Sequence, residues 1–306
     1  MGLALLGKLC SLFLIMLAGY VIVRCGLLRS EDSHTLSVLC LYLICPCSIF
    51  SAFQIESNPS IVSGLLMCLA AAVVIHAVYI ITVTLLKKPL KLDAVEQTSI
   101  IYTNAGNLII PIVSSVLGPE WVIYTCAFIC VQIPLQWSHC KSLICNKRHM
   151  DWKKILTNMN IIAVFLGVIL FVTGLKLPSF VQNTIDSLGS TIGPVSMLVV
   201  GMLLGGMELK YVFLRRRTWL ITFLRLVVLP LITVLFLRLG AAHSSLPDGD
   251  KVLLITLLAA SAPAAATVTQ MAQVYGANEH DACAINVMTT LLCIVTMPLM
   301  VALYQL

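Results

Sequence analysis

Two stretches of the sequence place polar side chains and a proline inside otherwise apolar segments. They are TNAGNLIIPIV at 103–113 and SAPAAATVTQ at 261–270. Proline removes a backbone hydrogen bond and clashes with the preceding turn, and backbone groups freed inside a membrane must face a cavity or find polar partners. Both stretches therefore indicate broken membrane helices. The candidate binding residues at these breaks are Asn104, Asn107, Pro111, Pro263, Thr267 and Gln270.

Two broken helices that cross near the middle of a membrane would expose half-helix ends. Free N–H groups and the positive end of a helix dipole suit an anion, whereas carbonyl ends suit a cation. Amide side chains such as Asn104 and Asn107 add donors for a carboxylate, so no fixed positive charge is required. The two stretches therefore predict a solute site near the middle of the membrane, with groups for an anion at one side and for a cation at the other.

The energy source is left open by the sequence, which offers three alternatives. Protons would need a deeply placed titratable group, and His76 is the one that lies well inside an apolar segment. Sodium would use backbone carbonyls at the breaks together with Gln132, Asn286 and hydroxyl groups. Uniport needs neither ion. Thr103, beside the first break, completes this set of candidates for coupling or for the solute pathway.

Arg225 lies about two turns into an apolar segment, where a charge needs a partner or a cavity. One interpretation is a counter-charge on the solute pathway. The other is a packing arginine whose long side chain extends to the membrane interface. The sequence leaves both interpretations open.

The composition indicates that membrane-spanning helices position these residues. The chain has 306 residues, of which 59% are hydrophobic and only 10% are charged, so we expect an integral membrane protein of the all-α class. Apolar runs repeatedly reach the roughly 18 to 25 residues that a helix needs to span a hydrocarbon core. The ten predicted spans lie at 3–23, 34–54, 61–86, 98–117, 120–139, 159–175, 180–205, 217–239, 251–275 and 281–304.

The basic residues predict the topology of these spans in the bilayer. The loops after the odd-numbered spans hold Arg24, Arg29, Lys87, Lys88, Lys91, Lys141, Lys147, Arg148, Lys153, Lys154, Lys210, Arg215, Arg216 and Arg217. The opposite loops hold only Lys176, Arg238 and Lys251. By the positive-inside rule, the first set faces the cytoplasm and both termini lie outside. The net charge of +6 thus has a topological explanation, and we expect no nucleic-acid partner.

The two halves of the sequence resemble each other at one constant offset. Gly19 aligns with Gly167, Gly26 with Gly174, Pro46 with Pro194 and Ser48 with Ser196. Each half, 1–145 and 153–306, contains five predicted spans, and an odd number inverts the second half in the membrane. Inverted repeats are typical of secondary transporters, with the site near the midplane. A separate pattern, Gly201-x-x-x-Gly205, predicts close contact between helices.

Other classes of function are less well supported by the residues. Cys45-Pro46-Cys47 is similar to the metal-binding motif of ATP-driven pumps, but no nucleotide-binding loop accompanies it. We therefore expect no metal and no cofactor. Because no paired carboxylates or Ser-His-Asp set converges in the spans, we also expect no enzymatic activity. A non-transporting membrane sensor on the same fold is the remaining alternative, disfavoured because the sequence shows no signalling domain.

The motifs together resemble the auxin efflux carrier family, which includes plant PIN proteins and bacterial organic-acid permeases. TNAGNLIIPIV is similar to the family's N-x-G-N-x-x-x-P segment, and the likeness extends through GYVIVRCGLLRSED, PVSMLVVGMLLG and SAPAAATVTQMAQVYGANEHD. The resemblance covers essentially the whole chain. It implies ten helices in two inverted five-helix repeats, with helices 4 and 9 broken where they cross. It also implies a scaffold of helices 1, 2, 6 and 7, a transport domain of the others, elevator-type movement and a homodimer.

Carried over by position, the resemblance places the crossover at Pro111 and Pro263 and a carboxylate-binding amide at Asn107, with Asn104 beside it. The second break has no asparagine, so Thr267 or Gln270 would have to serve there, and auxin itself is in doubt. The long loop of many plant members between helices 5 and 6 is absent. A bacterial permease for small carboxylates, in the inner membrane, fits the resemblance better than a plant hormone exporter.

Overall fold

A computed structural model gives the fold, and it describes residues 2–54, 59–146, 153, 156–241 and 248–306. Within these ranges the chain is helical, and its one β-type pairing is an isolated bridge between Thr103 and Ala264. The chain forms two compact units, and each unit is assembled from three separate pieces of the sequence. The basic residues Lys147, Arg148 and Lys154 of the predicted topology lie outside the described residues.

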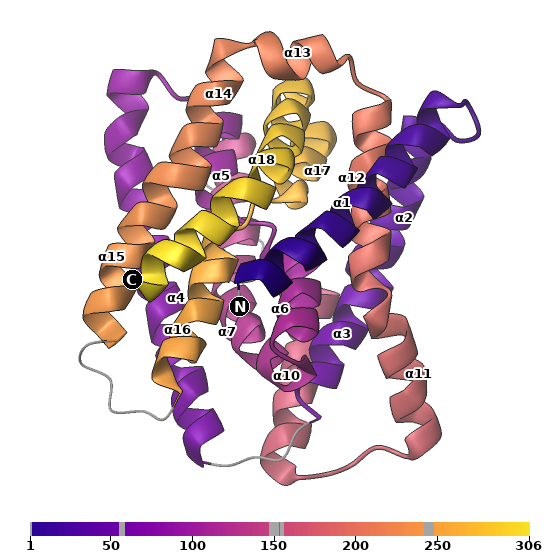
Figure 1. Ribbon diagram of the computed structural model, residues 1–306, viewed down its shortest axis with the longest axis vertical. Coiled ribbons are helices and arrows are strands. Elements are labelled where there is room, and N and C mark those ends of the chain that lie inside the picture. The colour runs from indigo at the N-terminus through magenta and orange to yellow at the C-terminus, as the bar shows by residue number, and fades with distance from the viewer. Residues whose placement is uncertain (1, 55–58, 147–152, 154–155, 242–247) are drawn as a thin grey trace. The chain divides into compact units, whose positions relative to one another are not determined.

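Unit 1 comprises residues 1–65, 106–126 and 153–207. Its helices come from the first, second, sixth and seventh predicted spans, with the second part of the fourth (Figure 1). They are α1 (Gly2–Arg24), α2 (Ser33–Leu39), α3 (Cys45–Ala52), α6 (Ile110–Val116), α10 (Met159–Thr173), α11 (Ser179–Ser190) and α12 (Ile192–Gly205). Short 3-10 turns at Ser30–Asp32 and Pro119–Trp121 complete the unit, together with the first turns of α4 and α7.

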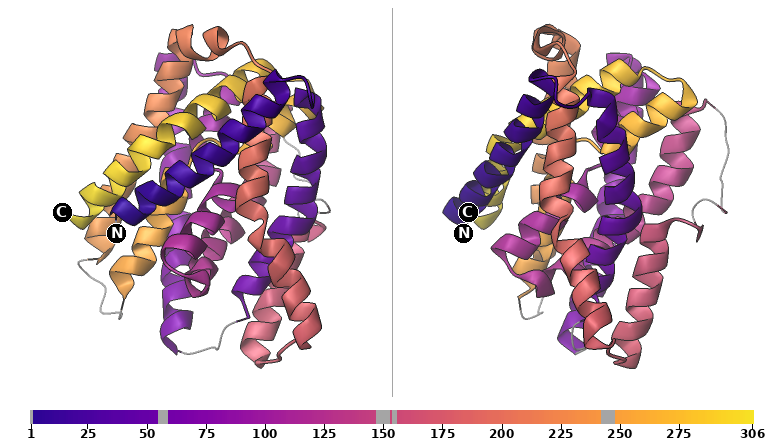
Figure 2. Two further views of the ribbon diagram at one scale, coloured as in Figure 1. Left: turned by 45° about the vertical axis from the view of Figure 1, so that its right-hand side comes forward. Right: turned by 90° about the vertical axis from the view of Figure 1, so that its right-hand side faces the viewer.

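Helix α1 packs closely along α12, as the views in Figures 1 and 2 agree. Glycine makes this approach possible, because a Cβ on Gly201 would lie 1.9 Å from the Met16 carbonyl oxygen and one on Gly19 would lie 2.5 Å from the Leu198 carbonyl oxygen. A Cβ on Gly205 would lie 2.7 Å from the Cβ of Val23. The prediction that Gly201-x-x-x-Gly205 serves close helix contact is therefore confirmed.

Unit 2 comprises residues 66–105, 127–152 and 208–306. Its principal helices are α4 (Pro59–Leu90), α5 (Ala94–Ile101), α7 (Val122–Leu135), α8 (Lys141–Ile144), α13 (Leu209–Leu214), α14 (Arg216–Phe223), α15 (Leu229–Ala241), α16 (Gly249–Ser261), α17 (Ala266–Tyr275) and α18 (Glu279–Gln305). The first turns of α4 and α7 belong to unit 1. The two interrupted segments, α5 and the pair α16 and α17, both contribute to this unit.

Six helical stretches are long and apolar enough to cross a membrane. They are Ser30–Ala52, Pro59–Leu90, Pro119–Ile144, Ser179–Gly205, Arg216–Gly240 and Glu279–Gln305. Two shorter apolar helices, Cys10–Arg24 and Met159–Thr173, coincide with the predicted first and sixth spans. The predicted fourth and ninth spans are each divided by a non-helical break. The protein is therefore a polytopic helical membrane protein.

Several helices contain a π-helical segment next to a proline. The segments Cys40–Ile44, Ala105–Ile109 and Leu224–Val228 each end two residues before a proline, namely Pro46, Pro111 and Pro230. Because proline donates no backbone hydrogen bond and crowds the preceding turn, the helix there widens to the i to i+5 pattern. Each segment thus marks a local distortion that the proline causes.

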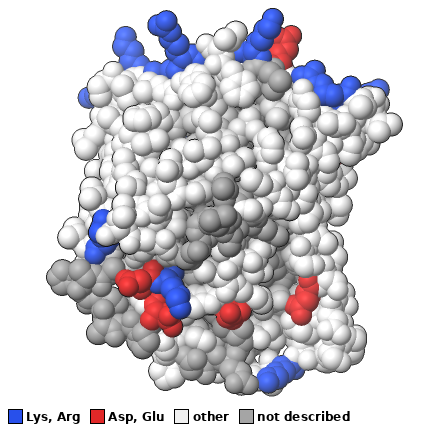
Figure 3. Space-filling view, viewed as in Figure 1, with Lys and Arg blue, Asp and Glu red and all other residues white. Residues whose placement is uncertain are grey.

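In each unit, an arginine side chain joins the ends of two helices. In unit 1, the Arg24 side chain donates to the Met207 carbonyl at 2.9 Å, so the end of α1 lies beside the end of α12. In unit 2, Arg217 donates to the Leu90 carbonyl at 2.8 Å, which joins the basic end of α4 to the basic start of α14. The face drawn in Figure 3 is covered mostly by residues other than Lys, Arg, Asp and Glu. The orientation that the positive-inside rule predicts stays a prediction.

Candidate functional site

The two broken segments of unit 2 pair with each other at their breaks. Helix α5 ends at Ile101, and Tyr102 is extended, with φ −93° and ψ 135°. The N–H of Asn104 donates to the Pro263 carbonyl at 2.8 Å, and the N–H of Ala265 donates to the Tyr102 carbonyl at 3.0 Å. Two strand-like hydrogen bonds therefore hold the breaks side by side and satisfy backbone groups that the interrupted helices leave unpaired.

Gln132 of α7 holds the first break from the side. Its Oε1 accepts the Thr103 N–H at 3.2 Å and the Thr103 hydroxyl at 2.8 Å, and its Nε2 donates to the Thr103 carbonyl at 2.8 Å. One amide side chain thus satisfies both backbone groups of Thr103 and its hydroxyl. The sequence alone did not predict this pairing. The three hydrogen bonds use the amide of Gln132 together with the hydroxyl and both backbone groups of Thr103.

Helix α18 holds the second break in a similar way. The Asn286 Nδ2 donates to the Ala264 carbonyl at 2.8 Å, and the Thr289 hydroxyl accepts the Ala264 N–H at 3.1 Å. Both side chains are buried. Asn286 and Thr289 lie three residues apart on one face of the helix, so they can bind the carbonyl and the N–H of the same residue, Ala264. The Oδ1 of Asn286 remains without a partner among the described residues.

Arg225 lies behind the paired breaks and binds the carbonyl ends of both interrupted helices. Its Nε and Nη2 donate to the Ala262 carbonyl at 3.0 and 2.6 Å. Nη2 also donates to the Ala260 carbonyl at 2.6 Å, and Nη1 donates to the Ile100 carbonyl at 3.1 Å. The side chain is fully buried, with its guanidinium 5.6 Å from the centre of the Tyr79 ring. Arg225 is therefore a cap shared by α5 and α16.

Within the described part of the chain, helix dipoles rather than a carboxylate balance the charge of Arg225. A helix C-terminus carries a partial charge of about −0.5, so two such ends supply about −1 against one guanidinium. The structure does not support the interpretation of a side chain that extends to the membrane interface, because Arg225 is 0% exposed and contacts backbone carbonyls and Tyr79 among the described residues. The interpretation of a counter-charge on the solute pathway stays a prediction.

Asn104 is the polar group that the crossover leaves unoccupied. Its backbone N–H is paired, but its side-chain amide has no hydrogen-bond partner among the described residues, although the residue is only 6% exposed. The N-terminus of α17 begins just after the second break, and no side chain caps it. Thr269 in that helix is buried, and its hydroxyl is also unpartnered within the described part of the chain. Donors without a partner among the described residues therefore lie where each break ends and the next helical segment begins.

The other predicted site residues are placed as follows. Pro263 lies within the paired break, and Thr267 is half-buried in the first turn of α17. Pro111 is buried in unit 1, where a Cβ on Gly193 would lie 2.9 Å from its ring. The side chains of Asn107 and Gln270 lie outside the described part of the structure.

His76 is buried in unit 2. Its Nδ1 lies 2.8 Å from the Ala72 carbonyl, and its ring centre lies 4.7 Å from that of Phe128. Its Nε2 is buried without a hydrogen-bond partner among the described residues. The interpretation of His76 as a proton carrier stays a prediction.

The sequence interpretation missed Thr289 and the carbonyl groups of Ile100, Ala260 and Ala262. Thr289 could have been found, because Asn286 and Thr289 form a polar pair at helical spacing inside an apolar span. The carbonyl groups carry no signal in residue type. Their role depends on Arg225, which reaches them from a distant part of the chain.

Comparison with known families agrees with this architecture. A profile described as membrane transport protein matches residues 4–149 and 141–301, which together cover almost the whole chain. The chain belongs to the auxin efflux carrier family of membrane transport proteins. No curated protein matches the sequence. As a member of this family, the protein is a membrane transporter.

Proposed function

We propose that this membrane transport protein carries small organic anions and binds them at the paired breaks of α5, α16 and α17. The observation that carries the proposal is the difference between the two ends of the crossover. Arg225 occupies the carbonyl ends of the interrupted helices, whereas the Asn104 amide and the N-terminus of α17 have no side-chain partner in the described part of the chain. Donor groups with a positive dipole end favour a carboxylate.

The same difference argues against sodium as the coupling ion. A sodium site at the breaks would use backbone carbonyls, and the Ile100, Ala260 and Ala262 carbonyls already accept from Arg225. Gln132, a further candidate sodium ligand, is committed to Thr103. A fixed positive charge beside the crossover would also repel a second cation. We therefore infer that transport is independent of sodium.

The family resemblance also supports a proposal for how the protein moves its solute across the membrane. The six long spans, the two shorter apolar helices and the two broken segments add up to ten crossings, as two inverted repeats at 1–145 and 153–306 require. Unit 1 contains the helices of the expected scaffold, but it also contains residues 106–126, which belong to the fourth and fifth helices of the expected transport domain; unit 2 contains most of that transport domain. Elevator-type movement of unit 2, a homodimer formed through unit 1, and a bacterial inner membrane with both termini outside are the accompanying proposals.

The test is uptake of labelled mono- and dicarboxylates by liposomes that contain the purified protein. We expect uptake of at least one carboxylate by the wild-type protein and a loss of about tenfold or more with Asn104→Ala, because a free amide donor disappears. Asn107→Ala should weaken binding likewise. The matched control is Asn183→Ala, which removes an exposed amide of α11 in unit 1. Equal uptake by wild type and Asn104→Ala would remove Asn104 from the site.

Thermal stability provides an independent measure of binding. A ligand at 100 times its dissociation constant stabilises a fold by about 2.7 kcal/mol. We expect carboxylates to raise the melting temperature of the wild-type protein and to leave that of Asn104→Ala almost unchanged. A rise with inorganic cations and none with carboxylates would contradict the proposed anion selectivity.

A further inference from the structure

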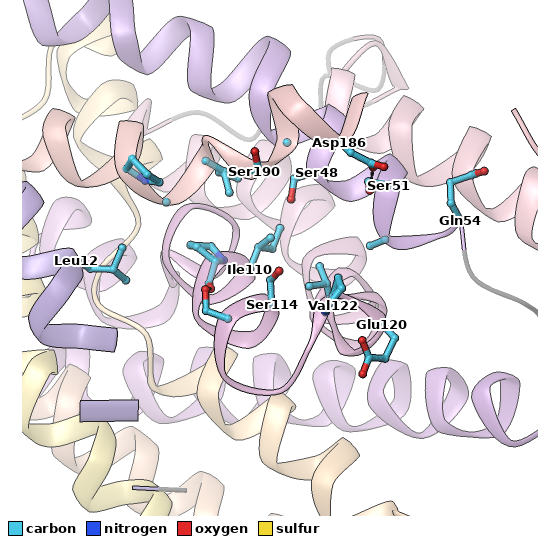
Figure 4. A pocket seen from close by; sticks show the side chains of 18 of the residues that line it. Leu12, Ser48, Ser51, Gln54, Ile110, Ser114, Glu120, Val122, Asp186 and Ser190 are labelled. Atoms are coloured by element: carbon cyan, nitrogen blue, oxygen red, sulfur yellow. Dashed lines mark hydrogen bonds between the residues drawn. The ribbon is translucent and has the colours of Figure 1, made fainter. Parts of the chain in front are cut away.

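Unit 1 contains a pocket of about 660 Å³ between α3, α6 and the junction of α11 with α12. Figure 4 shows Ser51 and Asp186 on one side of it and Glu120 across the space from them. Its lining includes Pro111, a residue assigned to the crossover, so the pocket carries no separate assignment. Residues of unit 2 that neither the paired breaks nor this pocket includes form another exposed surface, at α13 and the ends of α4 and α14.

Helix α13 lies across the beginning of α14 and does not continue its direction (Figures 1 and 2). Arg215, between the two helices, is extended, with φ −81° and ψ 106°, and this residue turns the chain. Helix α14 begins the stretch Arg216–Gly240, which is long and apolar enough to cross a membrane. A helix that lies crosswise to such a span runs along the membrane surface, where amphipathic helices bind.

Contacts with α18 fix α13 to unit 2. The Tyr211 hydroxyl donates to Asp281 Oδ1 at 2.9 Å, and the Arg215 guanidinium forms an ion pair with the same carboxylate. Asp281 is buried in the first turn of α18, and Val212 of α13 is fully buried as well. These contacts set the orientation of α13, so the side chains that it exposes have a defined direction.

The exposed side chains at the end of α13 are large and apolar. Phe213 is 36% exposed and Leu214 is 76% exposed. Trp219, which is 47% exposed in the next helix, donates from its Nε1 to the Phe213 carbonyl at 2.7 Å, so its indole lies beside the end of α13. Tryptophan is enriched at membrane–water interfaces, because its apolar ring and its N–H suit the headgroup level. These three side chains, the apolar patch, therefore indicate that α13 lies at headgroup depth.

Basic side chains lie on α13, on α14 and on the end of α4. Arg217 donates to the Leu90 and Lys91 carbonyls at 2.8 and 2.9 Å, which places the end of α4 beside the start of α14. The exposed basic residues of these elements are Lys87, Lys88, Lys91, Lys210 and Arg216. Within the part of the chain that the structure describes, none of these five side chains forms a hydrogen bond or an ion pair. They are therefore available to an anionic partner.

Acidic side chains cancel only part of this charge. Glu96 and Asp281 are buried and already paired, with Arg217 and Arg215 respectively, so neither is available to the exposed bases. The five bases outnumber the other acids of the neighbouring turns, which are Asp93, Glu208 and Glu279. The surface is thus positive on balance, and a negatively charged partner complements it.

We propose that this surface is an interfacial binding site for anionic phospholipids. Their phosphate groups accept hydrogen bonds from the basic side chains, while the apolar patch enters the boundary between headgroups and acyl chains. An acidic soluble protein would match the charge, but exposed apolar side chains at the start of a membrane span favour lipid. Each basic residue near an anionic membrane strengthens binding by about fivefold. The inference goes beyond the proposed anion transport and does not depend on it.

The experiment uses Trp219 as a single fluorescent probe in nanodiscs with brominated lipids, which quench tryptophan on contact. The full-length protein carries Trp121→Phe, Trp137→Phe and Trp152→Phe, and its melting temperature reports whether it is folded. One set of phosphatidylcholine nanodiscs contains a small fraction of brominated phosphatidylglycerol, and the other contains the same fraction of brominated phosphatidylcholine. We expect phosphatidylglycerol to be enriched about fivefold or more around Trp219. Equal quenching by the two lipids, or quenching by neither, would overturn the proposal.

A triple variant tests the basic side chains. Lys87→Gln, Lys88→Gln and Arg216→Gln together should bring the quenching by phosphatidylglycerol down to that by phosphatidylcholine. Enrichment that this variant retains in folded form would contradict the assignment. Native mass spectrometry of the protein with all its tryptophans compares the same two lipids, and equal affinity for them would also overturn the proposal.

The matched control removes the same charge elsewhere. Lys176→Gln, Arg238→Gln and Lys251→Gln together replace three exposed basic residues outside the surface and should leave the enrichment unchanged. Loss of enrichment in this control would show a general effect of net charge and contradict a local site.

Two soluble competitors distinguish other partners. Glycerol 3-phosphate carries the phosphate without acyl chains, and polyglutamate carries the charge of an acidic protein. We expect neither to reverse the quenching, and full reversal by either would assign the surface to a soluble phosphate or to a protein. Asn104→Ala should leave the enrichment unchanged whether or not the protein transports a carboxylate, so the two proposals fail independently.

Discussion

The guanidinium of Arg225 binds the carbonyl oxygen of Ala262 through two of its nitrogens, at 3.0 and 2.6 Å. Ala262 is the first extended residue after α16, so this contact fixes the point where the helix stops. The remaining donors join the same side chain to Ala260 and to Ile100 at the end of α5. One arginine thus ties together the ends of two helices that the sequence separates widely.

Replacement of Arg225 should destabilise the protein strongly. Arg225→Gln leaves two helix ends without their cation, and the loss of a buried charge partner costs roughly 3–5 kcal/mol. Arg225→Lys keeps the charge but not the planar fork, so we expect a smaller loss of about 1–3 kcal/mol. Thermal melts in detergent measure both. The control is exposed Arg216→Gln, and equal melting of all three variants would contradict the shared cap.

Transport should be unaffected when sodium is replaced by potassium or choline. The carbonyl groups of Ile100, Ala260 and Ala262 at the breaks already accept hydrogen bonds from Arg225, and its positive charge would repel a sodium ion. Initial rates of carboxylate uptake into liposomes, at constant membrane potential and pH, provide the measurement. A rate that rises several-fold with a sodium gradient would show that sodium has another site.

Gln132 should be essential for the stability of the first break. Gln132→Leu leaves the backbone N–H and the carbonyl of Thr103 unsatisfied in a buried position, at about 1–3 kcal/mol for each group. Gln132→Glu keeps the acceptor and loses the donor, so its free energy of unfolding should lie between those of wild type and Gln132→Leu. Denaturation monitored by circular dichroism tests this order, and a stable Gln132→Leu variant would refute it.

Gly201→Ala should disrupt the contact of α1 with α12. The added Cβ would lie 1.9 Å from the Met16 carbonyl oxygen, and a backbone atom cannot move aside as a flexible side chain can. We expect a loss of about 3 kcal/mol, at the upper end of overpacking effects. The matched control is Gly7→Ala in α1, where no atom lies within 4 Å of the added Cβ. The helix propensity of alanine should make that change neutral or slightly stabilising.

The helical spans and the two breaks could be predicted from local sequence. Long apolar runs such as 61–86 correspond to α4, because a helix satisfies its own backbone groups in a membrane. Pro263 and its neighbours predicted the interruption between α16 and α17, because proline cannot continue a helix. The amides and hydroxyls that flank the breaks were identified as polar partners for the same reason.

What the sequence by itself determined is therefore the membrane class, the spans, the positions of the breaks and the family motifs, all of which depend on neighbouring residues. Only the tertiary structure decided which polar groups are free. Gln132 and Arg225 are bound to the breaks, the Asn104 side chain has no partner among the described residues, and Asp186 accepts hydrogen bonds from Gln182 and Ser51 in unit 1. Most of these pairings join residues far apart in the chain, and hydrogen bonds between distant segments leave no periodic signal in the sequence.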